Sequence, residues 1–186
     1  METITVKDFK KDNLFKLLTL FQGREVHKVG RIDMTYVTID SLREEFRVVA
    51  TDSHVMVVLT FPLTQYLDFI LSLKAQRPYI DVKNLDVDNP KDMLIQVNTS
   101  QLTDSEPLII GGPYPQWERV IPTTEDPINH LTKFSFTIHE TMKKTYKLLN
   151  FKDVKGWSPD FQKNAKMPAI TKPYDNVLIL TIPLRV

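Results

Sequence analysis

Positions 46–60 read Phe46-Arg47-Val48-Val49-Ala50-Thr51-Asp52-Ser53-His54-Val55-Met56-Val57-Val58-Leu59-Thr60. The two apolar runs in this stretch, 46–50 and 55–60, have the length and the β-branched content of strands. The polar break between them, Thr51-Asp52-Ser53, has the composition of a turn. The stretch therefore predicts two consecutive strands joined by a short turn.

The flanking sequence extends this pattern in both directions. Upstream, positions 3–6 predict a short strand, positions 8–21 an amphipathic helix that stops near Gly23, and positions 32–39 another strand. The simplest arrangement of these elements is a β-α-β-β-β unit. Downstream, positions 63–74 have helical spacing, and short strands are expected at 79–83, 93–98 and 108–110.

The second half of the chain repeats the first in outline. A strand is predicted at 134–138, a helix at 140–151, a loop at 152–173 and a strand at 177–182. The tetrapeptide Phe15-Lys16-Leu17-Leu18 of the first helix is echoed by Tyr146-Lys147-Leu148-Leu149 in the second. We therefore expect an α+β fold of repeated β-α-β-β-β units, with helices on one face of antiparallel sheets.

A proline-rich segment around 111–127 lies between the two halves and predicts an ordered crossing loop or a linker. A boundary near Pro122 divides the chain into residues 1–122 and a partial second unit, residues 123–186. The two units either share one core or form two.

Composition narrows the class of protein. The 186 residues contain no cysteine, which excludes disulfides and thiolate metal sites and fits a reducing compartment. The first residues lack the apolar stretch of a secretory signal, and no run approaches membrane-spanning length, so we expect a cytoplasmic protein without a membrane partner. The net charge of +1 argues against a wholly basic nucleic-acid coat, although local basic patches are compatible with it.

The sequence offers no catalytic, metal or cofactor motif. With five glycines, it has no glycine-rich phosphate loop, and its four histidines show no metal-ligand spacing. Thr51-Asp52-Ser53-His54 holds the residue types of a nucleophile triad, but consecutive residues cannot align as nucleophile, base and orienting acid. We expect a protein that is not an enzyme and has no cofactor; a hydrolase that uses Ser53 and His54 is a distant alternative.

Lysines are grouped on both predicted basic helices. Lysines on an amphipathic helix often form only its solvated face. Their repetition favours a second interpretation, in which two basic faces meet DNA phosphates without reading bases. The candidate DNA-binding residues are Lys10, Lys11 and Lys16 on the first helix and Lys143, Lys144 and Lys147 on the second.

Three separated segments resemble the bacterial beta sliding clamp, in the family's order. Positions 50–54 are similar to its Ala-Thr-Asp-Gly-His turn, positions 114–122 to its proline-rich domain connector, and positions 182–186 to its C-terminal tail. The resemblance implies a DNA-clamp-like fold and a hydrophobic pocket for the peptide motifs of DNA polymerases and other clamp-binding proteins. The implied pocket residues are Thr51, Ser53, His54, Val55, Pro115, Val120, Ile182, Pro183, Leu184 and Arg185.

Two departures from the family pattern bear on this resemblance. Ser53 and Val55 stand where the family usually has glycine and arginine, which affects the turn and one polar contact of the pocket. The chain is also about half the expected length, so a first domain and part of the last are expected to be absent.

The resemblance implies a clamp-like processivity factor that binds double-stranded DNA non-specifically and tethers a polymerase or repair protein. Because one chain supplies too few domains to close a ring, a homo-oligomer that joins edge to edge is expected. The alternative is a stand-alone partner-binding module or decoy that keeps the pocket and does not encircle DNA.

Overall fold

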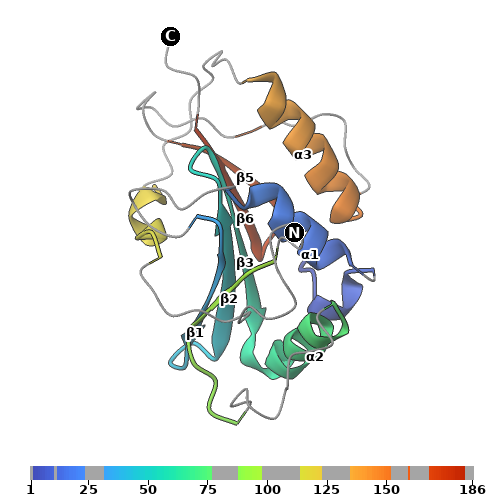
Figure 1. Ribbon diagram of the computed structural model, residues 1–186, viewed down its shortest axis with the longest axis vertical. Helices are drawn as coiled ribbons and strands as arrows, with labels where there is room; N and C mark the ends of the chain where they lie inside the picture. The colour runs from blue at the N-terminus through green and yellow to red at the C-terminus, as the bar shows by residue number, and fades with distance from the viewer. Residues whose placement is uncertain are drawn as a thin grey trace.

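The computed structural model of the protein describes residues 2–10, 12–23, 32–76, 88–97, 114–122, 135–151, 159 and 168–182. Within these ranges, the strands form one antiparallel sheet with the order β4-β1-β2-β3-β6-β5. Three α-helices cover one face of this sheet (Figure 1). The strands are β1 (Thr35–Asp40), β2 (Glu45–Thr51), β3 (Val55–Pro62), β4 (Met93–Ile95), β5 (Ala169–Tyr174) and β6 (Val177–Thr181).

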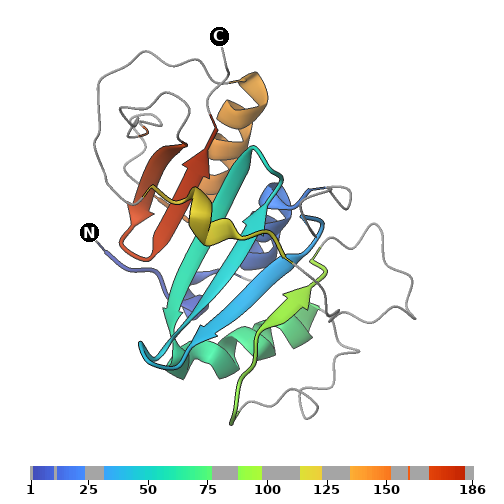
Figure 2. The ribbon, with the colours of Figure 1, turned by 90° about the vertical axis from the view of Figure 1, so that its left-hand side faces the viewer.

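The helices on that face are α1 (Asn13–Phe21), α2 (Tyr66–Gln76) and α3 (Phe136–Leu148). Short 3-10 helices are also present: η1 (Val6–Asp8), η2 (Leu63–Gln65) and η5 (Trp117–Val120). η5 lies on the opposite face of the sheet, where it crosses the strands (Figure 2). The confirmed fold class is thus α+β, with an antiparallel sheet that carries its α-helices on one side.

The central strands β2 and β3 are buried on both faces, which explains why their sequence is an almost continuous apolar run. In β3, Val57, Leu59 and Phe61 belong to the larger hydrophobic cluster, which contains the buried residues of all three α-helices. Met56 and Val58 belong to a smaller cluster that contains Trp117 of η5. The sheet therefore separates two cores, a large one under the helices and a small one under η5.

The two halves of the sequence share the sheet and the larger core. β3 pairs with β6 over five residue pairs, from Val55↔Thr181 to Leu59↔Val177. Residues Ile138, Met142 and Tyr146 of α3 lie in the same buried cluster as α1 and α2. The sheet is thus continuous across the division between residues 1–122 and 123–186, and that division stays a prediction about the two repeats.

Asn176, in the turn between β5 and β6, ties both halves to the N-terminal segment. Its side-chain Nδ2 donates to the backbone oxygens of Ile4 at 2.7 Å and Thr60 at 2.9 Å. Its Oδ1 accepts from the backbone N–H of Ile4 at 2.9 Å. These bonds satisfy the backbone groups of Ile4, which lies outside the strands, and join it to Thr60 of β3.

Two expected strands are wrong for a local reason. Residues 3–6 form no strand, because Ile4 bonds Asn176 and because Thr5 and Asp8 close a capping box around η1. A strand is expected at 134–138, but α3 begins at Phe136, after Ser135, whose hydroxyl accepts from the backbone N–H of Ile138 at 3.3 Å. The apolar residues at 134, 136 and 138 alternate as in a strand, but positions 134 and 138 are also one helical turn apart. The spacing alone therefore does not distinguish a strand from a helix here.

The expected loop at 152–173 is also corrected, because β5 begins within it at Ala169. Pro173 in this strand is tolerated because β5 stands at one end of the strand order, where a missing N–H breaks no central ladder. The helix expected at 63–74 is confirmed as η2 and α2. The strands expected at 79–83 and 108–110 lie outside the described residues.

In the part of the chain that the structure describes, none of the helices has the length and apolarity needed to span a bilayer.

Candidate functional site

The turn between β2 and β3 is held by hydrogen bonds from its own side chains. The Asp52 carboxylate accepts from the backbone N–H groups of His54 and Val55, both at 2.8 Å. The Thr51 hydroxyl donates to the carbonyl of Val55 at 2.9 Å and accepts from the N–H of Ser53 at 3.1 Å. An aspartate and a threonine that bond the backbone two to four residues away lock such a turn. The turn therefore presents a rigid edge to whatever lies above it.

Ser53 has a φ of 76°, which is the left-handed region that favours glycine. The turn thus has the backbone conformation that the family's glycine would adopt without strain, although a serine occupies the position.

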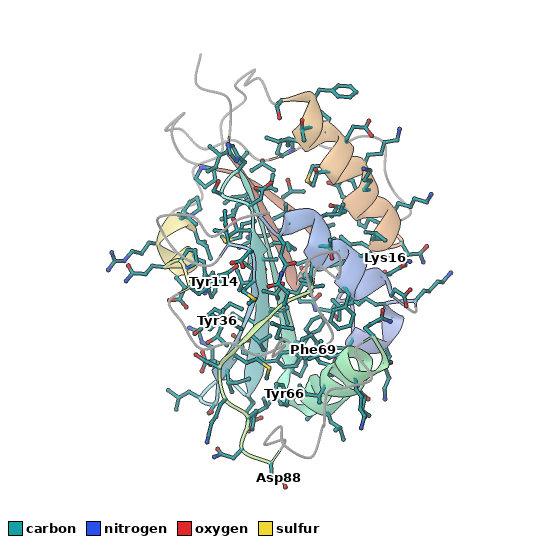
Figure 3. The ribbon with its side chains drawn as sticks, in the orientation of Figure 1. Lys16, Tyr36, Tyr66, Phe69, Asp88 and Tyr114 are labelled. Atoms are coloured by element: carbon teal, nitrogen blue, oxygen red, sulfur yellow. The ribbon has the colours of Figure 1, made fainter. Side chains whose placement is uncertain are left out.

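Residues 114–122, hereafter the strap, run across the sheet face opposite the α-helices (Figure 2). Trp117 anchors the strap, because it is buried in the smaller core with Val58 and Leu180. Tyr114 stacks on Tyr36 with ring centroids 5.1 Å apart, and its hydroxyl donates to the carbonyl of Val49 at 3.1 Å (Figure 3). Burial raises the pKa of the Tyr114 phenol well above its ordinary value.

An ion pair joins the strap to the sheet at a second point. The Arg47 guanidinium of β2 lies 3.7 Å from the Glu118 carboxylate of η5. Because the Glu118 side chain is largely exposed, this pair stabilises the strap only slightly. Aromatic burial, rather than charge, therefore holds the strap on the sheet.

The end of β6 completes the arrangement. The backbone N–H of Ile182 donates to the carbonyl of His54 at 2.8 Å, which places Ile182 beside the turn. Turn, strap and β6 end together enclose a pocket of about 390 Å³, hereafter the strap pocket. It is lined by Ile32, Thr51, Ser53, His54, Val55, Met56, Pro115, Gln116, Trp117, Arg119, Val120, Pro168, Leu180 and Ile182.

The strap pocket brings together all the described residues that the resemblance implied for a peptide pocket. These are Thr51, Ser53, His54, Val55, Pro115, Val120 and Ile182. The remaining three, Pro183, Leu184 and Arg185, lie outside the described residues. That the strap pocket binds a peptide stays a prediction.

Sequence reasoning missed half of the lining. Met56 and Leu180 line the pocket because their side chains lie on the strap side of the sheet. Met56 was missed because Val55, its neighbour in the strand, was assigned to the pocket, and neighbouring residues of a strand point to opposite faces. Ile32 is held in place by Gly23, where an added Cβ would lie 2.6 Å from the Ile32 Cδ1 atom. Trp117 and Arg119 lie inside the connector motif at 114–122, so the motif itself carried a signal for both.

The lining is apolar with a positive edge. Among the described lining residues, Arg119 carries the permanent charge, and none of them has a carboxylate. Exposed apolar side chains stand at the rim: Val120 is 48% exposed and Ile182 43% exposed. A cleft of this size with apolar walls and few polar groups fits a short extended peptide, and its positive edge favours an acidic one.

Ser53 and His54 lie close enough to hydrogen bond, but they lack the third member of a triad. The Ser53 Oγ atom is 3.3 Å from His54 Nδ1. The nearby Asp52 carboxylate accepts from backbone N–H groups of the turn and not from the imidazole. Within the described residues, the contact therefore has no orienting acid, which nucleophilic catalysis by serine and histidine requires.

The basic residues of α1 and α3 lie on the opposite side of the molecule from the strap. α1 and α3 pack against each other, and Lys16 of α1 stands on their side of the sheet (Figure 3). Lys16, Lys144 and Lys147 line one cavity of about 580 Å³, and Lys10 and Lys143 are exposed nearby in the sequence. Lys11 lies outside the described residues. The structure thus gathers three of the six candidate DNA-binding lysines in one place.

Comparison of the sequence with protein-family models and with curated proteins finds no match. Comparison of the fold with solved structures does. The DNA polymerase sliding clamp from Bacillus subtilis superposes with a TM-score of 0.50 and 12% sequence identity, covering 98% of this chain and 63% of that one.

Two further structures are similar at comparable coverage. The beta chain of DNA polymerase III from Streptococcus pneumoniae gives a TM-score of 0.49 at 12% identity, over 95% of this chain and 64% of that one. A sliding clamp from Bartonella birtlesii, solved bound to griselimycin, gives 0.47 at 14% identity, over 95% and 64%.

The chain spans just under two thirds of the length of these clamps. The similarity to the Bacillus subtilis clamp confirms the predicted resemblance at the level of the fold. The chain has an α+β fold similar to that of the bacterial DNA polymerase III beta sliding clamps.

Proposed function

We propose that the protein is a clamp-like replication factor that holds a short partner peptide in the strap pocket while its helix face meets DNA. It acts without catalysis, in the cytoplasm, as a tether for a DNA polymerase or another clamp-binding protein. This function rests on the clamp-like fold and, above all, on the convergence of turn, strap and β6 end into one pocket.

The shape and chemistry of the strap pocket support a peptide as its occupant. Its walls are formed by rigid elements: a hydrogen-bonded turn, a strap anchored by Trp117, and the end of a central strand. A preformed apolar cleft binds an extended peptide without a large ordering cost in the protein. The Arg119 side chain at its edge fits an acidic residue of the peptide.

A direct binding test uses a fluorescein-labelled hexapeptide with Leu-Phe beside one aspartate, measured by fluorescence anisotropy. Val120→Asp and Ile182→Asp place a carboxylate on the apolar rim, and each is expected to weaken binding by about tenfold. Both side chains are substantially exposed, so the substitutions should leave thermal unfolding unchanged.

The matched control is Leu42→Asp, which makes the same kind of change at a position that is 99% exposed in the turn between β1 and β2. Leu42 is not among the lining residues of the strap pocket. A peptide affinity that is equal in all three variants would contradict the proposal. So would equal binding of a peptide in which Leu-Phe is replaced by Ala-Ala.

The helix face supports the DNA contact. Three lysines gather between α1 and α3, and phosphate contacts of this kind bind DNA without regard to sequence. The triple variant Lys143→Ala/Lys144→Ala/Lys147→Ala tests the contact through the salt dependence of duplex binding. The slope of log affinity against log salt is expected to flatten by roughly one unit for each phosphate that the variant no longer neutralises.

Lys172→Ala is the control, because Lys172 is exposed on β5 and lines a cavity with Trp117 and Glu118 of the strap, away from the α-helices. A triple-lysine variant whose slope equals that of the wild type would remove the DNA part of the proposal and leave the pocket.

One observation favours the second candidate, a partner-binding module that does not grip DNA. α2 also lies on the helix side, yet its exposed residues include Leu67 and Leu71, each about half exposed. A face that is partly apolar is poorly suited to phosphates. The module predicts peptide binding at the strap pocket without salt-dependent affinity for duplex DNA. Peptide anisotropy and the salt dependence of duplex binding, as described above, distinguish it from the clamp-like factor.

Encirclement of DNA requires several copies of the chain, joined through sheet edges. β5 stands at one end of the strand order and pairs, among the described strands, with β6. Sedimentation at high protein concentration tests this step, and a strictly monomeric protein would exclude the ring while leaving the pocket proposal unaffected.

A further inference from the structure

The cavity on the helix side, hereafter the helix-face cavity, lies where α1, α2 and α3 meet the end of β4. Its volume is about 580 Å³, within the range of sites that hold small ligands. Its lining residues are Asp12, Phe15, Lys16, Thr19, Leu20, Leu73, Gln76, Gln96, Val97, Lys144, Lys147 and Leu148. Binding of DNA phosphates requires only basic side chains on the surface and no cavity. The helix-face cavity therefore requires a separate explanation.

The charged lining of the helix-face cavity is predominantly positive. Lys16, Lys144 and Lys147 are all exposed, and they come from two different helices. The lining carboxylate, Asp12, is already engaged: it accepts from Gln76 Nε2 at 2.6 Å and lies 3.6 Å from the Lys16 ammonium. The cavity therefore presents cations to a ligand, and its charge is complementary to an anion.

The floor of the cavity is apolar and contains a buried amide. Phe15, Leu73 and Val97 are each less than a tenth exposed and contribute apolar surface. Gln96 is only 6% exposed and is one of the residues that line the cavity. A glutamine amide in the wall of a cavity can both donate and accept, so the lining suits a ligand with a donor and an acceptor on one edge.

We propose that the helix-face cavity holds one unpaired nucleotide of a DNA strand that lies across α1 and α3. The phosphates flanking the nucleotide contact Lys16, Lys144 and Lys147, and the base enters the hollow and packs on its apolar floor. The Gln96 amide bonds the base edge, which in an unpaired base is free to donate and accept. This inference rests on the proposed DNA binding by the helix face and adds a preference for unpaired bases.

Other anionic ligands match these features less well. A paired duplex keeps its base edges within the helix and offers phosphates to the lysines, so it leaves the apolar floor and Gln96 unused. A fatty acid would fill the floor and meet a lysine, but its chain offers nothing to the buried amide. An unpaired nucleotide combines an anion, a flat apolar surface and a polar edge, and aromatic or apolar packing of bases contributes strongly to the binding of single strands.

The test compares two labelled DNAs by fluorescence anisotropy: a blunt duplex, and the same duplex with a single-nucleotide bulge. The full-length wild-type chain is expected to bind the bulged duplex about fivefold to tenfold more tightly. Gln96→Leu should lower this ratio toward one while leaving the affinity for the blunt duplex unchanged. Thr19→Trp, at an exposed lining position of α1, should do the same by filling the mouth of the cavity.

The control for the amide is Gln116→Leu, because Gln116 is an exposed glutamine of the strap on the other face of the sheet. It should keep the wild-type ratio. Thermal unfolding separates a ligand role from a structural one. Gln96→Leu keeps a side chain of similar size at this position, so its unfolding temperature should stay near that of the wild type.

Each outcome decides a distinct question. A wild-type ratio near one, with duplex binding that the triple-lysine variant weakens, would overturn the nucleotide site and leave the DNA proposal standing. Duplex binding that the triple-lysine variant leaves unchanged would instead remove the DNA proposal. Displacement of the bulged DNA by dodecanoate at concentrations at which dAMP has no effect would identify the site as one for an acyl chain and overturn the inference.

Discussion

The turn that borders the strap pocket contains a serine in a backbone conformation that favours glycine, and we expect Ser53→Gly to stabilise the protein. Ser53 has a φ of 76°. A residue with a Cβ atom costs about 1–2 kcal/mol in this region relative to glycine. Glycine also lowers stability by about 0.4–1 kcal/mol, because it increases the conformational entropy of the unfolded chain.

The remaining difference is a gain of about 0.5–1 kcal/mol in the free energy of unfolding. The hydrogen bonds of the turn survive the substitution, because Ser53 contributes its backbone N–H, which donates to the Thr51 hydroxyl at 3.1 Å. The contact of the Ser53 hydroxyl with His54 is exposed, so its loss costs little. For a chain of this length the gain corresponds to a rise in melting temperature of about 1–4 °C.

Urea unfolding monitored by circular dichroism measures the difference, and two variants isolate its cause. Ser53→Ala removes the hydroxyl and keeps the Cβ atom, so its stability should stay near that of the wild type. Asn150→Gly, at a second positive φ of 54°, should change stability less than Ser53→Gly, because asparagine tolerates this region. Equal stability of the glycine and alanine variants at position 53 would refute the backbone argument.

Two more predictions concern the ties that hold the site in place. Asn176→Ala removes three hydrogen bonds to backbone groups of Ile4 and Thr60 and should lower the free energy of unfolding by about 2–4 kcal/mol; unchanged urea unfolding would show that these bonds are replaced by water. Tyr114→Phe tests a pH effect, because burial raises the pKa of the Tyr114 phenol. The stability that the protonated phenol contributes is fully present below the ordinary phenol pKa of about 10 and is lost as the pH rises above that value. The stability of the variant should therefore fall less steeply above pH 10, and identical alkaline unfolding of variant and wild type would contradict this.

Much of the fold follows from local pattern. The apolar runs around the turn at 51–54 match β2 and β3 closely, because strands buried on both faces require continuous apolar sequence whatever surrounds them. The spacing of Leu14, Leu17, Leu18 and Phe21 likewise identifies the buried side of α1. Elements with such strong periodicity were predicted correctly.

The errors fall where a distant partner or a cap overrides periodicity. Residues 3–6 have the alternation of a strand, but the backbone groups of Ile4 bond the side chain of Asn176, 172 residues away. α3 extends back to Phe136 because Ser135 caps it. β5 was missed because its apolar run is short and contains Pro173, and only its pairing with β6 makes it a strand.

The sequence by itself determined the residue types of the candidate sites: a polar turn, an apolar connector and two lysine-bearing helices, each recognisable from neighbours within a few positions. The tertiary structure alone decided which of them meet. One pocket forms from the turn, the strap and the end of β6, because β6 pairs with β3 and Trp117 is buried against Val58 and Leu180. All of these contacts join residues that are 59 or more positions apart. Gln96 and the lysines of α1 and α3 likewise share a cavity although they are distant in the sequence. Hydrophobic burial brings segments together because of the apolar surface that they remove from water, whatever their order along the chain.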